Sequence, residues 1–296
     1  MQTATSRPAR PGTEGDGTAT RRRSTPVPAT PEDPGVTRAR RVWTAGAYDR
    51  IAAGFRHEAE AFVARLGVAP GTYVLDAACG SGNLTIPLAR GGARVFGLDI
   101  ARNLLHEAQA WAARERVGVM LDEGTVEEMP YADGAFPLVV SMFGAMFAAR
   151  PALVASELAR VTRQGGRVAM ANWVMGGFIG RMLALHVAYA PPPAGAPSTL
   201  LWGDEAALRE RFPAEHWDLT LTPRVLTFRF PHSPAGTAEL FRASYGPTVR
   251  TLEAITEDQR AEFGQRLREL WESAHRAGAS GTEVDSEYLE VVATRR

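Results

Sequence analysis

Two acidic residues and a glycine-rich turn lie within residues 73–99 and together could bind a nucleoside. Asp76 and Asp99 each end a short apolar run, and Gly80 and Gly82 lie between those runs. A glycine lets the backbone approach a ligand closely, because it has no side chain to fill that space. A carboxylate after the second run can accept hydrogen bonds from both hydroxyls of a ribose. This spacing predicts a nucleoside-binding site.

The elements that must hold these residues are predicted by a regular alternation of apolar runs and amphipathic stretches. Such alternation is typical of parallel strands joined by helical crossovers. We therefore expect an α/β, Rossmann-like, doubly wound and mostly parallel seven-stranded sheet with helical cap insertions. The predicted strands cover residues 73–76, 93–99, 117–121, 136–141, 167–173, 225–230 and 288–294.

The charge at the turn distinguishes between two cofactor classes. Open parallel sheets bind ligands beyond the carboxyl ends of their strands, where the strand order reverses. Asp76 at that position would repel a pyrophosphate but would suit the ammonium group of S-adenosylmethionine. A dinucleotide fingerprint would also require a third glycine where this chain has Thr85. The pattern favours S-adenosylmethionine as cofactor, with an NAD-dependent oxidoreductase as the alternative.

Residues 42–173 resemble class I S-adenosylmethionine-dependent methyltransferases, in the UbiE-like, methyltransferase-domain family of bacterial small-molecule enzymes. The run from Val74 to Asn83 resembles the first motif of this class, and Asp99 matches the acid that ends its second strand. Other segments resemble the adenine-contacting loop, the end of strand four, the turn before strand five and the last strand. These segments are residues 124–130, 140–144, 158–166 and 288–294.

The resemblance implies a set of cofactor-binding residues. It places Asp76, Gly80 and Gly82 around the methionine part, Asp99 on the ribose, and Ile100 against the adenine. Val126 would offer its backbone to the adenine edge. The remaining residues that it implies near the cofactor are Tyr48, Ala78, Asn83, Thr125 and Ser141.

Three of these positions carry a qualification. Thr125 stands where many relatives have aspartate, and a hydroxyl is a weaker acceptor for the adenine amino group. Ala78 replaces a glycine that is common in the wider class. Tyr48 lies on the predicted helix before the sheet, where it could close over the methionine carboxylate or belong to the core.

Large apolar side chains follow the fourth and fifth predicted strands and could wall an acceptor pocket. Ordinary core packing is the competing interpretation, especially for Met146. A weakly charged, aromatic pocket would suit a hydrophobic or quinone-like small molecule of specialised metabolism. The residues expected in this pocket are Phe143, Met146, Phe147, Trp173 and Phe178.

Methyl transfer from a sulfonium requires alignment and a dry pocket more than it requires a catalytic base. The catalytic residues therefore stay unassigned, and a proximity mechanism is favoured. The six histidines show no acid-base partner at fixed spacing. Only His186 is a candidate base, because it lies in the segment expected to cover the site.

Composition excludes several classes of protein. The 33 basic and 33 acidic residues balance, so no overall field would gather nucleic acid. The single cysteine, Cys79, permits no internal disulfide and fits a reducing compartment, so a cytoplasmic location is expected. Neither a metal-ligand cluster nor an apolar run long enough to cross a membrane is found in the sequence.

The chain divides into a tail and one globular domain. Residues 1–40 are rich in proline, threonine and arginine and lack large apolar side chains, so we expect them to be disordered. Residues 41–296 are expected to form the methyltransferase domain, with cap segments over about 175–210 and 233–280. The tail and the helix after it could exchange between protomers, which is one route to a homo-oligomer.

Three functions are consistent with these patterns. The first is S-adenosylmethionine-dependent methyl transfer to a hydrophobic small molecule, with neither nucleic acid nor membrane as partner. The second is an NAD-dependent oxidoreductase, and the third is a methyltransferase-like protein that binds or cyclises a ligand without methylating it. The acceptor and the atom that is methylated are not specified by the sequence.

Overall fold

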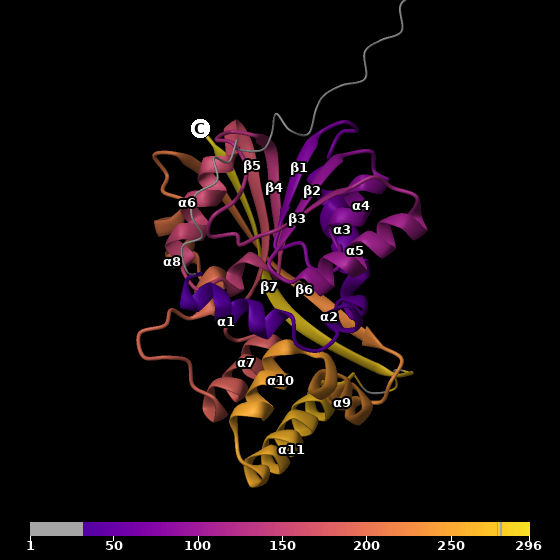
Figure 1. Ribbon diagram of the computed structural model, residues 1–296. Coiled ribbons are helices and arrows are strands. Elements are labelled where there is room, and N and C mark those ends of the chain that lie inside the picture. Colours follow the sequence, from indigo (N-terminus) through magenta and orange to yellow (C-terminus); the bar gives the residue numbers. More distant parts are fainter. Residues whose placement is uncertain (1–31, 277, 279) are drawn as a thin grey trace, which may run out of the picture.

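The computed structural model describes residues 32–276, 278 and 280–296. A seven-stranded sheet forms its centre, with the order β3-β2-β1-β4-β5-β7-β6 (Figure 1). The first five strands are parallel, and β7 pairs antiparallel with both β5 and β6. The predicted Rossmann-like, mostly parallel seven-stranded sheet is confirmed. Its strands are β1 (Tyr73–Ala77), β2 (Arg94–Asp99), β3 (Met120–Glu123), β4 (Phe136–Met142), β5 (Thr162–Trp173), β6 (Trp217–Phe230) and β7 (Thr282–Arg295).

Helices cover both faces of the parallel part of the sheet, with α3, α4 and α5 on one side and α6 on the other (Figure 1). Right-handed crossovers produce this arrangement, because the chain moves from β1 to β2 in one direction and from β4 to β5 in the other. The helices are α3 (Arg56–Leu66), α4 (Thr85–Arg90), α5 (Arg102–Glu115) and α6 (Pro151–Val161). The strand order thus reverses at β1, between β2 and β4.

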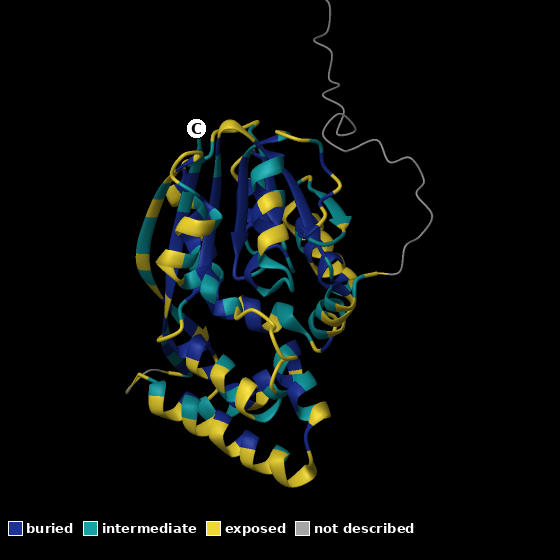
Figure 2. Ribbon diagram, turned by 90° about the vertical axis from the view of Figure 1, so that its left-hand side faces the viewer, coloured by how far each residue is buried: buried dark blue, intermediate teal, exposed yellow. Residues whose placement is uncertain are grey.

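A helical cap lies beyond the carboxyl ends of the parallel strands. It comprises α7 (Phe178–Tyr189), α9 (Pro234–Ser244), α10 (Gly246–Ala254) and α11 (Glu257–Ala274). Figure 2 shows the central strands as buried and the outer faces of the cap helices as exposed. Because α9, α10 and α11 lie between β6 and β7 in the chain, the predicted helical insertion between the last two strands is confirmed. The short α8 (Glu205–Arg211) and the 3-10 turns Ala145–Phe147 and Thr199–Gly203 complete the connections.

The start of the folded chain differs from the prediction. Residues 1–31 lie outside the described residues, but 34–40, which composition assigned to the disordered tail, belong to α1 (Pro34–Trp43). The Asp33 side chain accepts hydrogen bonds from the backbone N–H groups of Gly35 and Val36 and so caps this helix. After α1, α2 (Tyr48–Ala52) and the 3-10 turn Ala53–Phe55 lead into α3.

Several strand boundaries also differ. β5 begins at Thr162 rather than at residue 167, because Thr162 pairs with Phe136 and the register shifts before Arg167 pairs with Leu138. Gly165 has a φ of 70°, so it allows this irregularity where the sequence suggested only a break. β3 is displaced toward the carboxyl edge, and β6 and β7 extend well beyond their predicted ranges. None of the described helices is long and apolar enough to cross a membrane.

Candidate functional site

The turn after β1 holds the carboxylate of Asp99 at the end of β2. The backbone N–H of Gly80 donates to Asp99 Oδ2 over 2.7 Å, and that of Ala101 donates to Oδ1 over 2.8 Å. Burial raises the pKa of Asp99 to about 6, although these backbone hydrogen bonds act to lower it. The carboxylate is therefore fixed in place and buried without a strong counter-charge.

Three residues of this turn, Ala78, Gly80 and Gly82, have positive φ angles. Gly80 has a φ of 53°, and no atom lies within 4 Å of the place that a Cβ would occupy. Ala78 has a φ of 61°, which is strained for a residue with a side chain. This conformation explains why the wider class prefers glycine there, and it shows that the turn is held by its surroundings.

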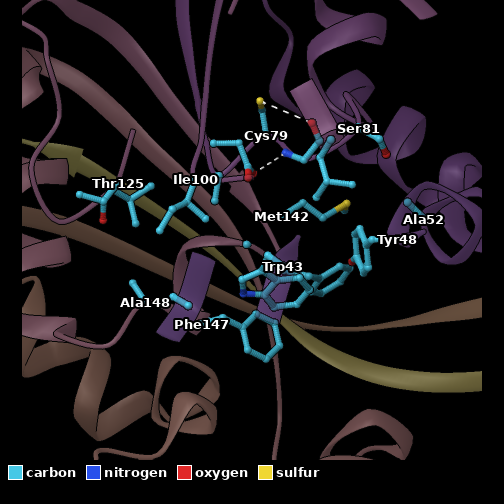
Figure 3. Close-up of a pocket in the computed structure, with 18 of the residues that line it drawn as sticks. Trp43, Tyr48, Ala52, Cys79, Ser81, Ile100, Thr125, Met142, Phe147 and Ala148 are labelled. Atoms are coloured by element: carbon cyan, nitrogen blue, oxygen red, sulfur yellow. Dashed lines mark hydrogen bonds between the residues drawn. The ribbon is translucent and has the colours of Figure 1, made fainter. Parts of the chain in front are cut away.

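A cavity lies beside this turn at the carboxyl edge of the parallel strands (Figure 3). It brings together many of the residues predicted for the cofactor and acceptor. Those that line it are Tyr48, Ala78, Gly80, Asn83, Asp99, Ile100, Thr125, Val126, Phe143 and Phe147.

Two buried polar atoms in the cavity wall have no hydrogen-bond partner in the structure: Ser81 Oγ and Asn83 Oδ1. The amide nitrogen of Asn83 donates to the Ala52 carbonyl over 3.0 Å, which fixes the orientation of that side chain. An unpartnered buried polar atom costs stability, so such atoms tend to have a partner in a bound ligand or water. Ser81 itself was not identified from the sequence.

Asp76 does not line the cavity, contrary to its predicted contact with the cofactor. Its carboxylate is 1% exposed and accepts a 2.6 Å hydrogen bond from the Thr85 hydroxyl at the start of α4. Burial raises its pKa to about 7, while the hydrogen bonds from Thr85 act to lower it. Because Asp76 is directed toward α4, it supports the turn from behind.

Gly82 and Ser141 also lie behind the cavity wall. A Cβ on Gly82, whose φ is 97°, would lie 3.2 Å from Ile86 and 3.4 Å from Ala108, so this glycine allows close helix packing. The Ser141 hydroxyl accepts a hydrogen bond from the backbone N–H of Ala145. The geometry thus gives both residues structural contacts rather than a place in the cavity wall.

Three of the residues predicted for the acceptor pocket stand outside it. Trp173 stacks on the far side of Phe143, with ring centroids 3.6 Å apart and an interplanar angle of 8°. Met146 Sδ accepts a hydrogen bond from the Trp173 backbone N–H. Phe178 packs against Trp271 in the cap, with centroids 4.6 Å apart. They support the wall or the cap and do not face the cavity.

His186 is not placed to act as a base. Its Nδ1 lies 2.7 Å from the Met182 carbonyl, so Nδ1 carries the proton and donates it. Nε2 then accepts from the Thr248 hydroxyl, also at 2.7 Å. Burial lowers the pKa of His186 to about 4, which keeps the ring neutral. His186 is therefore a packed cap residue.

Helix α1 forms a part of the cavity wall that was not predicted from the sequence. Val36, Ala39 and Trp43 lie on one face of this helix and line the cavity. Arg40 fastens the helix by donating 2.7 Å hydrogen bonds to the Ile100 carbonyl and to Glu123. The spacing of 36, 39 and 43 is a helical signal, but the composition of the tail obscured it.

The charged side chains in the described cavity wall are Asp99 and Glu127. Arg150 neutralises Glu127, since its Nε and backbone N–H donate to that carboxylate over 2.6 and 2.9 Å. Arg150 also forms an ion pair with Asp33 at the start of α1. The described residues contain no group of three or more side chains that could hold a metal ion.

The fold and the site at the carboxyl edge of its parallel strands define a class I S-adenosylmethionine-dependent methyltransferase domain. Residues 75–170 match the family described as methyltransferase domain, which favours this class over the oxidoreductase alternative. The chain is 34% identical over 235 residues to the uncharacterized protein Rv1405c of Mycobacterium tuberculosis, covering 79% of this chain and 85% of that protein. The chain belongs to the same family as this protein.

Two further likenesses agree with this assignment. Over 108 residues the chain is 34% identical to a demethylmenaquinone methyltransferase of Beutenbergia cavernae, covering 36% of this chain and 43% of that protein. The crystal structure of the YcgJ protein of Bacillus subtilis superposes with a TM-score of 0.56 at 14% identity. That superposition covers 81% of this chain and 99% of the other, and at this identity it supports the fold alone.

Proposed function

We propose that this protein transfers a methyl group from S-adenosylmethionine to a hydrophobic small molecule of specialised metabolism. The observation that carries the proposal is the buried Asp99 carboxylate, fixed by Gly80 at the point where the strand order reverses. It faces a cavity whose wall also holds unpartnered polar atoms of Ser81 and Asn83. A ligand with ribose hydroxyls and a charged amino acid end would satisfy these groups.

The residues present fit S-adenosylmethionine. Asp99 would accept hydrogen bonds from the ribose hydroxyls, and the bare backbone at Gly80 leaves space for the ligand. Ser81 and Asn83 would partner the methionine end, in place of the contact first expected from Asp76. Four residues would enclose the adenine: Ile100, Leu104, Thr125 and Val126.

The cofactor supplies an electrophilic methyl group, and the chain supplies position and a dry environment. Trp43, Phe147 and Tyr48 wall the cavity on the side away from the Gly80 turn (Figure 3). Excluding water strengthens the electrostatic contacts with the ligand, and fixed walls hold the acceptor in line with the methyl group. Residues 34–296 act as the methyltransferase unit in this proposal, and the expected location is the cytoplasm.

The first test compares the binding of S-adenosylmethionine and NADH by calorimetry. Saturable binding of S-adenosylmethionine alone is expected, and binding of NADH alone would contradict the proposal. The second test incubates the protein with S-adenosylmethionine carrying a deuterated methyl group and a set of apolar metabolites. Mass spectrometry should then show a product carrying the label. A ligand that is cyclised and unlabelled would instead support a methyltransferase-like protein without transfer.

A further inference from the structure

The acceptor side of the cavity is walled by three aromatic rings. The ring of Trp43 meets that of Tyr48 nearly edge to face, with centroids 5.4 Å apart, and meets that of Phe147 at 5.0 Å. All three line the cavity and come from α1, α2 and the 3-10 turn after β4 (Figure 3). The face of an aromatic ring carries negative potential and attracts a cation. This aromatic wall is therefore better suited to a positive charge than to a negative one.

The charged side chains around the cavity also favour a positively charged ligand over a negatively charged one. The cavity wall, as far as the structure describes it, contains no arginine, lysine or histidine. Its carboxylates are Asp99 and Glu127, and Glu127 is already paired with Arg150. A buried phenolate, carboxylate or phosphate on the acceptor would thus find no basic side chain there and would depend on the sulfonium of the proposed cofactor for its counter-charge, which makes its desolvation costly.

None of the described groups in the wall is placed to remove a proton from an acceptor. Burial, and then the nearby charge of Asp99, raise the pKa of Tyr48, so its phenol stays protonated. Burial likewise raises the pKa of the Cys79 thiol, whose sulfur is directed toward the Gly80 carbonyl. Asp99 would be engaged by the ribose under the proposed function, and Glu127 is paired with Arg150.

We propose that the acceptor atom is an uncharged nitrogen that bears no proton to be lost, in a flat and weakly basic N-heteroaromatic ring. This inference rests on the proposed function. The nitrogen lone pair forms the new bond to the methyl carbon while the carbon–sulfur bond breaks and its electron pair goes to sulfur. The positive charge passes from sulfur to nitrogen, no proton needs a base, and the aromatic wall faces the cationic product.

The test uses two ligands of the same shape that differ in charge. N-methylquinolinium is a product-like cation, and 1-methylnaphthalene is its neutral counterpart. Each is titrated into the full chain saturated with S-adenosylhomocysteine, and the tryptophan fluorescence is followed. The cation should bind roughly threefold to thirtyfold more tightly than the neutral ligand, as expected for a cation against aromatic faces.

A matched pair of variants locates the effect. Trp43→Leu should remove most of the preference for the cation and leave the affinity for 1-methylnaphthalene nearly unchanged. Trp111→Leu is the control, because Trp111 lies on α5 against Arg56 and outside the cavity. Its preference should equal that of the unaltered protein. Circular dichroism and S-adenosylhomocysteine binding establish that each variant is folded.

The outcomes separate the two proposals. Failure to bind S-adenosylhomocysteine would overturn the proposed function together with this inference. Normal binding of that nucleoside, with equal or weaker affinity for the cation or no saturable binding of it in the millimolar range, would overturn this inference alone. In turnover with labelled cofactor, methylation of 1-naphthol but not of quinoline would also overturn it, since a phenol must lose a proton.

Discussion

The turn at the edge of β1 and β2 and the helical cap both bury polar side chains, but in the described part of the chain only the turn leaves such side chains without a partner beside the cavity. In the cap, both ring nitrogens of His186 have partners within the protein, and the unpartnered atoms of Tyr189, Arg242 and Trp271 lie away from the cavity. At the edge, Ser81 Oγ and Asn83 Oδ1 have none, and the backbone of Ala78 is strained. A buried polar side chain whose hydrogen-bond partners all come from the protein indicates a structural role. A buried polar side chain that lacks a partner and lies beside a cavity indicates that a ligand supplies one. Four predictions test this difference.

The largest effect is expected in the cap core. Trp271 is fully buried and packs against Phe178, Phe241 and Phe230. Trp271→Ala should lower the free energy of unfolding by about 3–5 kcal/mol, because a large side chain leaves a cavity. Urea denaturation measures this loss. The affinity of the folded protein for S-adenosylmethionine should hardly change, and a comparable loss of affinity would show that cap and edge are not separable.

At the edge, the expected loss is in affinity rather than stability. Asp99→Ala should weaken S-adenosylmethionine binding by about 2 kcal/mol, or roughly thirtyfold, because the ribose loses a charged acceptor. Calorimetry measures this change. Asp218→Ala, on an exposed residue of β6, is the control and should bind normally. Unchanged affinity in Asp99→Ala would show that the ribose does not bind at this position.

The pH dependence of stability should have opposite signs in the two regions. The pKa of Asp76 is raised to about 7 on folding, so the folded form binds more protons and gains stability as the pH falls from 7 toward 4. The pKa of His186 is lowered to about 4, so its region loses stability as the pH falls from 6.5 toward 4.

Each group can change the slope of the free energy of unfolding against pH by at most about 1.4 kcal/mol per pH unit. Thermal melting of Asp76→Asn without ligand should lose part of the stabilising pH dependence, and Asp99, whose pKa is raised to about 6, should keep the remainder. His186→Gln should lose the destabilising part, and its catalytic rate should keep the same pH profile. A changed pH profile of the rate in His186→Gln would restore this histidine as a candidate base.

The smallest effect is expected where α1 is fastened to the edge. Arg40→Ala removes ion pairs with Glu123 and Glu32 and a hydrogen bond to the Ile100 carbonyl, all at partly exposed positions. Its loss should weaken cofactor binding by about 0.5–1 kcal/mol, and added salt should reduce the difference. Titrations at low and high ionic strength measure this. Arg102→Ala, which removes only a more exposed pair with Glu123, should have less effect.

The parallel half of the sheet was predictable because each of its parts has a local signal. Apolar runs, glycine turns and terminal acids repeat along residues 73–173, and the resemblance to methyltransferases rests on the same segments. The positions of individual side chains were less predictable. Asp76 carries the residue type that a cofactor contact needs, but the direction of its side chain follows from its hydrogen bond with Thr85.

Helix α1 could not be predicted from composition, because much of what holds it in place comes from residues outside the helix. Val36 is its one fully buried residue, and the helix is held by Arg40, by the Asp33–Arg150 pair and by Arg250 donating to the Arg41 carbonyl. These partners lie far away in the sequence. Trp173 and Phe143 show a related limit, since the sequence placed both at the edge but could not show which ring covers the other.

Because α1 lines the cavity but contributes no strand to the sheet, one truncation should separate folding from the retention of a ligand. A chain cut before residue 44 would keep all seven strands, yet it would lose Val36, Ala39 and Trp43 from the cavity wall. Such a fragment should melt cooperatively while it releases small molecules much faster than the longer chain. Fragments chosen from sequence alone, beginning at residue 41, would keep Trp43 but lose Val36 and Ala39 with most of α1, so they too would look well folded and give misleadingly weak binding.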